Sequence, residues 1–478
     1  MSTFCCDRRK TAYNRNIPRK DGNQMRRVEQ RLFEIKGMIN SGNYSSLRSE
    51  LSVLDPADAA WLLKELDESE WSPVFRLLPK ETAAETFSQL DPDEQRILIE
   101  EFTDRELQAI LSEMYADDAA DLVEEMPANV VKRILRHTDP QKRSAINQLL
   151  KYPKDSAGSI MTTEFMDLKA QMTVAQAFDR IRKVGLERET VYTCYVTDQN
   201  RRLGGVITVL ELLVASPEET IGTLMNRDVI FFNTHDDREG VARAFDKYDF
   251  LAFPVADGEG RLVGVITVDD AMEVLVEEDT EDIEKMAAIL PTDKPYLKTG
   301  IFETFKKRIP WLLILMISAT FTGRIIAGFE AALASQAVLI SFIPMLMDTA
   351  GNTGSQSSVT VIRSLSLDEL RFKDLFRVAW KEIRVAVLCG GALATANFIK
   401  IVLVDNLLFR AQISVLVAAV VCLTLCCTVL VAKTVGCMLP MVAKNLGFDP
   451  AVMASPFITT IVDAIALLIY FAISFALL

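Results

Sequence analysis

Five long apolar stretches near the C-terminal end limit this chain's possible folds more than any other feature. They cover approximately residues 310–329, 334–362, 383–404, 411–439 and 451–478. Each reaches the roughly 20 residues that a helix needs to cross a bilayer, and a membrane admits only helices and closed barrels. We therefore expect an all-α transmembrane domain of five helices. Basic residues before the first stretch and between the second and third place the N-terminus in the cytosol and the C-terminus outside.

The charges are distributed unevenly along the chain. Residues 301–478 carry 14 basic and 10 acidic side chains, whereas residues 28–300 carry 30 basic and 53 acidic ones, a net charge of −23. Such a field attracts cations and repels nucleic acid, which we therefore exclude as a partner. The chain has only two histidines, and its eight cysteines show no metal-ligand spacing. Hard oxygen ligands are the metal-binding groups that it holds in quantity.

Residues 28–155 have the pattern of short amphipathic helices. Three of these helices are predicted to begin at Asp-Pro pairs, with Asp55, Asp91 and Asp139 as caps and the proline in the first turn. Helices of this length that follow one another closely stack into a superhelix. We expect an acidic, all-α superhelical N-domain. It follows a basic arm over residues 1–27, which is either a disordered tail or a contact for anionic membrane lipid.

A direct repeat occupies residues 156–272. The segment from Leu203 to Glu211 recurs from Leu262 to Asp270, at an offset of 59 residues, and each copy predicts a strand pair followed by a helix. This tandem pattern resembles a pair of CBS (cystathionine-β-synthase-type) domains, of α+β class. The expected boundaries are 156–218 and 219–272.

An acidic connecting helix is predicted between the repeat and the apolar stretches, over residues 273–300. Nine carboxylates lie between Asp269 and Glu284, with Lys285 as the nearest basic residue. A helix of this composition repels itself unless cations bind to it. Residues 301–478 then form the transmembrane domain.

Polar residues interrupt the apolar pattern at two places. The second stretch contains the polar run from Asp348 to Ser358, and the fifth contains Asp463. A carboxylate at mid-membrane costs on the order of 2.5–3.5 kcal/mol and should face protein or water. The glycines of the polar run predict that the backbone leaves regular helix there, which is tolerated where it lines a cavity. Together these residues predict an aqueous path for cations.

The order of these parts resembles the MgtE family of magnesium channels and transporters. The resemblance covers almost the whole chain and is most specific at Gly351-Asn-Thr-Gly-Ser-Gln356 and at Pro456-Phe-Ile-Thr-Thr-Ile-Val-Asp463. It implies a homodimer in which Asp463 of both subunits holds Mg²⁺ with much of its water shell. Asn352, Thr353 and Gln356 either line the same pore or form interhelical hydrogen bonds. Asp348 departs from the family pattern and either adds a second acidic ring or pairs with Arg324 or Arg363.

The resemblance also implies that cytosolic Mg²⁺ closes the pore by binding to the acidic parts. Matching positions assign three groups of regulatory ligands. They are Asp270, Glu273, Glu278, Glu281 and Asp282 on the connecting helix; Asp237, Glu239 and Asp249 in the second repeat; and Asp117 and Asp121 in the N-domain.

CBS domains also suggest an adenine-nucleotide site. The candidate residues are Thr208, Glu211 and Phe250. In members of the family that bind ATP, the second of these positions is Asp, and an aromatic residue stands where this chain has Thr193. These departures weaken the expectation of ATP as a ligand.

Other functions stay open at this point. The path could carry another divalent cation such as Co²⁺, or exchange one ion for another, or the chain could be a membrane sensor that transports nothing. An enzyme is not expected, because the sequence has no nucleophile motif, no phosphate-binding glycine loop and no histidine-based acid and base pair.

Overall fold

The computed structural model describes residues 22–292, 296–329, 337–453 and 455–478. Most of the predicted basic arm lies outside these residues. The chain divides into two compact units, with the boundary between Val274 and Leu275. We call them the N-terminal unit and the C-terminal unit and describe each on its own.

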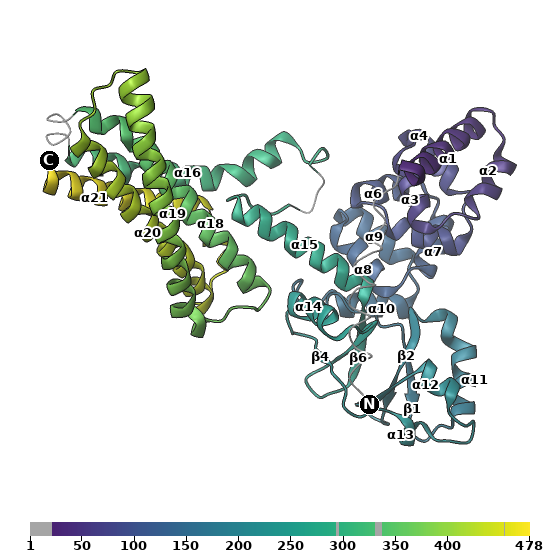
Figure 1. Ribbon diagram of the computed structural model, residues 1–478. Coiled ribbons are helices and arrows are strands. Elements are labelled where there is room, and N and C mark those ends of the chain that lie inside the picture. The colour runs from purple at the N-terminus through teal and green to yellow at the C-terminus, as the bar shows by residue number, and fades with distance from the viewer. Residues whose placement is uncertain (1–21, 293–295, 330–336, 454) are drawn as a thin grey trace. The chain divides into compact units, whose positions relative to one another are not determined.

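The first part of the N-terminal unit is entirely helical (Figure 1). Its helices are α1 (Gly22–Asn40), α2 (Tyr44–Leu51), α3 (Pro56–Lys64), α4 (Glu68–Phe75), α5 (Lys80–Ser88), α6 (Pro92–Glu101), α7 (Asp104–Glu113), α8 (Ala116–Glu125), α9 (Ala128–His137) and α10 (Pro140–Leu149). Helix α3 packs on α5, α5 on α7, and α7 on α9, as successive turns of a superhelix do. The predicted superhelical N-domain is confirmed.

Local sequence explains where several of these helices begin. Asp55 and Asp139 accept hydrogen bonds from backbone N–H groups in the first turns of α3 and α10, each with proline in that turn. At α6 the Glu94 carboxylate accepts from the Asp91 N–H at 3.0 Å. All three Asp-Pro pairs therefore start helices as predicted. Phe87 and Phe102 are almost fully buried in the core that the helices share.

Two small three-stranded sheets follow in the N-terminal unit. The first contains β1 (Phe165–Lys169), β2 (Thr190–Thr197) and β3 (Leu203–Thr208), and the second contains β4 (Phe232–Asn233), β5 (Ala252–Ala256) and β6 (Leu262–Thr267). In each sheet the first two strands are parallel and the last two antiparallel. The associated helices are α11 (Val174–Val184), α12 (Val209–Val214), α13 (Ile221–Leu224), α14 (Arg238–Tyr248) and α15 (Val268–Met286).

The two sheets are related by the repeat found in the sequence. Tyr195 pairs with Val206 in the first sheet, and Pro254 pairs with Val265 in the second, again at an offset of 59 residues. The copies join through reciprocal backbone bonds: the Leu203 N–H donates to Gly260, and the Leu262 N–H donates to Arg201. The predicted tandem α+β fold is confirmed.

The C-terminal unit is helical. It contains the end of α15 and the helices α16 (Ile301–Gly328), α18 (Ile343–Ser366), α19 (Leu375–Lys400), α20 (Val415–Asn445) and α21 (Ser455–Leu477), together with a π-helical extension of α19 over Ile401–Leu408. Helix α18 packs on α20 and α21, and α19 packs on α20. Their shared core contains Leu346, Val421 and Tyr470.

Four of these segments are long and apolar enough to cross a membrane. Among the described residues they are Ile301–Gly328, Phe372–Leu408, Val415–Asn445 and Pro450–Leu477. Helix α18 has the length but not the apolar character, because its middle turns carry the polar run. The predicted helical membrane domain is confirmed.

The predicted break in the second stretch is wrong. Helix α18 runs without interruption from Ile343 to Ser366, and its glycines serve close packing instead. A Cβ added at Gly351 would lie 2.7 Å from the Thr459 methyl carbon of α21, and one at Gly436 of α20 would lie 2.3 Å from the Gly354 carbonyl oxygen. The sequence pattern of small residues therefore permits close helix contact rather than unwinding.

A buried charged group also links the membrane helices. Lys433 of α20 is 6% exposed, and its ammonium lies 3.1 Å from the Ser357 hydroxyl and 3.5 Å from the Glu382 carboxylate. The Ser357 hydroxyl donates to the same carboxylate at 2.7 Å. Charges removed from water are stable only when paired in this way, so the group ties α18, α19 and α20 together.

Candidate cation-binding sites

A polar stripe runs along α18. Asp348, Asn352 and Gln356 are spaced by four residues, which places them on one side of the helix, and all three are exposed. Thr353 faces the interior and is 7% exposed. No ion pair joins Asp348 to Arg324 or Arg363 within the part of the chain that the structure describes. The stripe therefore offers a carboxylate and two amides on the surface of a single chain.

Asp463 of α21 lies beside this helix. Its Oδ1 is 3.5 Å from the position that a Cβ would take at Gly351, so the absence of a side chain there makes room for the carboxylate. The same oxygen is buried and has no hydrogen-bond partner among the described residues. Asp348 is close enough for its charge to act on Asp463. Two carboxylates and the α18 stripe thus lie in one region, as a cation path requires.

Three carboxylates from distant parts of the sequence meet in the N-terminal unit. Asp117 lies in α8, Glu189 directly precedes β2, and Asp270 lies in the first turn of α15. One oxygen from each lies within 4.8 Å of the others. We call this group the carboxylate cluster. Such an arrangement could hold a divalent cation, because carboxylate oxygen is the ligand that Mg²⁺ and Ca²⁺ prefer.

The carboxylate cluster is electrostatically strained without a cation. Burial is the main cause, and neighbouring carboxylates add to it. Together they raise the pKa of Glu189 to about 8 and that of Asp270 to about 7, and they raise the pKa of Asp117 well above its usual range. Burial and the charge of Glu273 also raise the pKa of Asp118 to about 6. A bound cation would relieve these groups.

The sequence predicted only part of this group. Asp117 and Asp270 were both expected to bind metal, although in separate sets. Asp121, their expected companion, is exposed one turn from Asp117, and Glu273 is exposed on α15. Glu189 was missed because nothing in the local sequence distinguishes it from the exposed Glu187, and only the fold brings it to the other two.

The other candidates of the second repeat have local roles. Asp237 caps α14 by accepting from the Gly240 N–H at 3.3 Å, and Glu239 pairs with Arg243. Asp249 ends the same helix in a left-handed conformation, with a φ angle of 56°. Among the described residues these three do not gather into a metal-ligating group.

The far end of α15 contacts other parts of the C-terminal unit. Lys285 lies 2.6 Å from Glu281 and 2.8 Å from Asp449, and the Ser366 hydroxyl at the end of α18 donates to Asp282 at 3.3 Å. Burial disfavours the ammonium, but its bonds to Asp449 and Glu281 outweigh that effect and raise the pKa of Lys285. Lys285 and Asp449 were not predicted. Glu278 lies one turn before Asp282 and is half-buried.

The nucleotide candidates are held by local contacts in the two CBS repeats. Thr208 and Glu211 are exposed and bonded to each other at 2.8 Å, and Phe250 stacks on Tyr248. None of the three lines the polar cavity of about 240 Å³ that contains Arg188 and Arg201.

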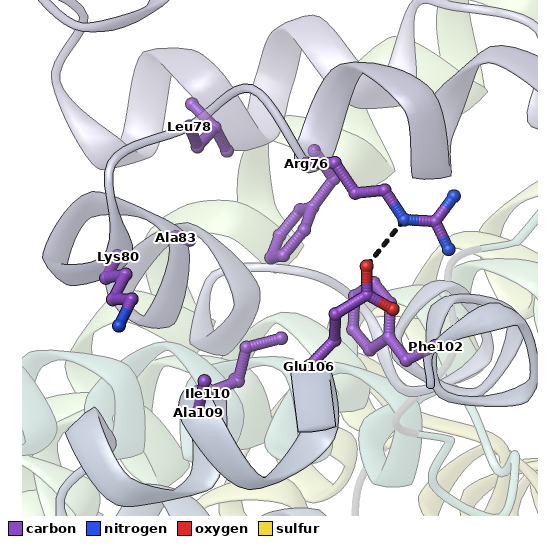
Figure 2. A pocket seen from close by; sticks show the side chains of 9 residues that line it. Arg76, Leu78, Lys80, Ala83, Phe102, Glu106, Ala109 and Ile110 are labelled. Atoms are coloured by element: carbon purple, nitrogen blue, oxygen red, sulfur yellow. Dashed lines mark hydrogen bonds and ion pairs between the residues drawn. The ribbon is translucent and has the colours of Figure 1, made fainter. Parts of the chain in front are cut away.

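A second cavity of about 240 Å³ lies among the N-domain helices (Figure 2). It is lined mainly by apolar residues such as Phe102 and Ile110, and the ion pair between Arg76 and Glu106, 2.7 Å long, lies beside it. No predicted site residue lines it.

Comparison with known proteins relates these features to one family. Residues 54–155 match the MgtE intracellular N domain, residues 221–277 match a CBS domain, and residues 343–473 match MgtE, described as a divalent cation transporter. The magnesium transporter MgtE of Thermus thermophilus is 36% identical over 456 residues, which are 94% of this chain and 99% of that protein. The chain belongs to the MgtE family. The predicted family resemblance is confirmed, and the chain is a membrane protein of a transporter family.

Two solved structures of magnesium-transport proteins match the N-terminal half. The soluble part of a magnesium transporter aligns over 52% of this chain and 99% of its own length, with 29% identity and a TM-score of 0.50. The cytosolic domain of the Mg²⁺ channel MgtE in complex with ATP aligns over 51% and 99%, with 36% identity and a TM-score of 0.49. The first of these supports the predicted order of an N-domain followed by paired CBS domains.

Proposed function

We propose that this chain is a Mg²⁺ channel of the cytoplasmic membrane that works as a homodimer and closes when cytosolic Mg²⁺ binds to its acidic parts. In this arrangement the N-terminus is cytosolic, the C-terminus lies outside, and membrane lipid surrounds the apolar helices. Mg²⁺ is both the conducted and the regulatory ion.

The observation that carries conduction is the exposed stripe of α18 beside Asp463. An exposed row of carboxylate and amide groups is unfavourable against lipid, so it must face water or a second protein surface. A second copy of the chain would place two stripes and two Asp463 side chains around one axis. Because Mg²⁺ gives up its water reluctantly, a wide polar site with two carboxylates suits it better than a tight cage.

The proposed control rests on both ends of α15. Its first turn contributes Asp270 to the carboxylate cluster, and its last turns contact Asp449 and Ser366 through Lys285 and Asp282. Cations neutralise the acidic parts and favour their packing, and loss of cations lets the same charges repel. Helix α15 connects these events to α18 and to the segment before α21.

Flux measurements test conduction. Proteoliposomes are loaded with a fluorescent Mg²⁺ indicator, and Mg²⁺ entry is followed for the wild type, Asp463→Asn and the control Asp405→Asn, which alters a carboxylate paired with Lys400. We expect entry driven by the Mg²⁺ gradient alone, lost in Asp463→Asn and kept in the control. Unchanged flux in Asp463→Asn contradicts the proposal.

The same assay separates the alternatives. A requirement for an imposed Na⁺ or H⁺ gradient indicates an exchanger, and Co²⁺ entry without Mg²⁺ entry indicates a carrier for another divalent cation. Absence of any ion flux indicates a sensor that transports nothing. Addition of ATP inside the vesicles tests whether Thr208, Glu211 and Phe250 bind a nucleotide that alters the flux.

Patch recording tests the proposed gating. Current is measured while Mg²⁺ varies on the cytosolic side, for Glu281→Gln with Asp282→Asn and for the control Asp279→Asn, which lies exposed on the same helix. We expect the double variant to conduct at Mg²⁺ concentrations that close the wild type and the control. Equal closure in all three proteins argues against the assignment.

A further inference from the structure

The carboxylate cluster occupies a place where the two CBS repeats differ. In the second repeat the Thr267 hydroxyl bonds to Asp270, as the Thr208 hydroxyl bonds to Glu211 in the first repeat, 59 residues earlier. Thr208 and Glu211 are exposed, whereas Thr267 is 4% exposed and Asp270 lies against α8. The repeat thus presents an equivalent pair of residues in two environments, one open and one closed by carboxylates from elsewhere.

Two of the three carboxylates lack the partners that buried polar atoms normally have. Asp117 is 8% exposed, and its Oδ1 has no hydrogen-bond partner among the described residues. The Glu189 Oε2 is also buried without a partner there. Buried polar atoms are nearly always bonded, so an unpartnered oxygen on each of two carboxylates of the same cluster indicates a missing ligand.

The ammonium of Lys142 does not supply that ligand. Lys142 of α10 is close enough to act on the charge of Asp117, but its Nζ donates to the carbonyl oxygens of Leu111 and Ser112 at 3.0 and 2.9 Å. It therefore caps α7, and among the described residues no ammonium or guanidinium forms an ion pair with the three carboxylates. A ligand that completes the cluster must be small and positively charged, and carboxylate oxygens must be able to coordinate it.

The geometry points to Glu189 as a ligand of a divalent cation held jointly with Asp117 and Asp270. With bonds of about 2.1 Å, adjacent ligands of an octahedral Mg²⁺ lie about 3.0 Å apart and opposite ligands about 4.2 Å apart. The three oxygens, within 4.8 Å of one another, would therefore draw closer together around a shared ion. Water would fill the remaining positions. Because the three residues come from α8, from the strand β2 region and from α15, the ion would fasten the N-domain to both CBS repeats.

This inference deepens the proposed function, because a cation at this site is one of those that would hold the acidic parts together. It does not depend on conduction, since binding can be measured without transport. The sequence analysis placed Asp117 and Asp270 in separate ligand sets. With Glu189 they form one site of three carboxylates, to which the first repeat contributes.

Ion binding to the full-length protein in detergent tests the assignment. Mn²⁺ serves as the probe, with bound ions counted by electron paramagnetic resonance and Mg²⁺ affinity measured by competition. We compare the wild type, Glu189→Gln and the control Glu187→Gln, which alters an exposed carboxylate two residues away. We expect Glu189→Gln to lose one bound Mn²⁺ or to weaken it at least tenfold, and the control to match the wild type. An unchanged count and affinity in Glu189→Gln overturns the proposal.

Thermal unfolding of the same proteins separates ligation from a structural role. With a chelator present, removal of one of three repelling carboxylates should raise the melting temperature of Glu189→Gln above that of the wild type. Saturating Mg²⁺ should then stabilise the variant less than the wild type, because a ligand stabilises only what it binds. A lower melting temperature in chelator with an undiminished gain from Mg²⁺ overturns the proposal. Reduced binding with unaltered gating supports Glu189 as a ligand and counts against the proposed control of the pore.

Discussion

Individual carboxylates of this chain behave differently according to whether the fold buries them. Glu187 is exposed, whereas Glu189, two residues later, has its pKa raised to about 8. The cause is the place of Glu189 beside Asp117 and Asp270, together with burial. The number of acidic residues in a segment therefore does not indicate which carboxylate has a raised pKa.

The carboxylate cluster predicts how stability depends on pH. The pKa of Glu189 rises from 4.5 to about 8 and that of Asp270 from 3.8 to about 7, so between about pH 5 and 8 the folded state binds more protons than the unfolded state. The contribution of these two groups to the stability of the fold is therefore complete at low pH. It is lost as the pH rises through their pKa values in the folded state. We expect the free energy of unfolding of the N-terminal unit to fall between pH 5 and 8 in a chelator.

Calorimetry with and without Mg²⁺ provides the measurement. Mg²⁺ should remove most of the pH dependence by taking the place of the protons. Stability that rises from pH 5 to 8 in chelator would show that the cluster is not strained as described.

Sequence reasoning identified residues where a pattern was local. Asp117 and Asp270 lie in acidic helices, and the Asp-Pro caps can be identified directly in the sequence. Glu189 has no such signal, because its partners are 72 and 81 residues away in sequence and meet it only through the packing of α8 and α15. Lys285 was read only as a neighbour of acidic residues, since its contact with Asp449 depends on tertiary packing.

At the scale of helices, the glycines of α18 and α20 control how closely the elements approach. The sequence predicted flexibility at Gly351 and Gly354 because glycine is the residue that most readily leaves regular helix. In the structure the same lack of a side chain permits contact between neighbouring helices. Periodicity along one helix cannot distinguish these two uses, because the difference lies in the partner helix.

Gly436→Ala tests the close approach of α20 to α18. The new methyl would lie 2.3 Å from the Gly354 carbonyl oxygen, so the helices must separate. We expect a loss of stability of about 1–3 kcal/mol, as overpacking typically gives, and a reduced ion flux. The control is Gly391→Ala on α19, where no atom lies within 4 Å of the added carbon.

Thermal unfolding in detergent compares the two variants. Gly391→Ala should keep or slightly raise the melting temperature, because alanine favours helix over glycine by about 1 kcal/mol. Equal effects of the two substitutions would mean that the crossing at Gly436 is looser than described.

At the scale of the whole molecule, the chain separates its charge from its apolar surface. Residues 28–300 carry a net charge of −23, and residues 301–478 carry +4. Composition alone located this division, and four of the five predicted stretches correspond to helices that are long and apolar enough to cross a membrane. Helix α18 is less apolar than the other four because the residues that make it polar are those proposed to line the path.

The acidic half predicts a response to simple salt. Raising KCl from about 0.05 to 0.5 M shortens the screening length and weakens repulsion among exposed carboxylates. In chelator we expect the melting temperature of the N-terminal unit to rise with salt. At saturating Mg²⁺ the rise should be smaller, because bound ions have already neutralised part of the charge. Scanning calorimetry at the four conditions checks this, and an equal rise with and without Mg²⁺ would contradict it.

The contact of Lys285 with the segment before α21 differs from the carboxylate cluster because it needs no bound cation. The ammonium of Lys285 joins Glu281 to Asp449 and is carried by the chain itself. A tethered group has an effective local concentration set by geometry, which dilution of the surrounding solution does not change. When free cations are withdrawn, we therefore expect this end of the helix to stay anchored while the opposite end is released. Helix α15 would then be held at Lys285 and free to move at the end that carries Asp270.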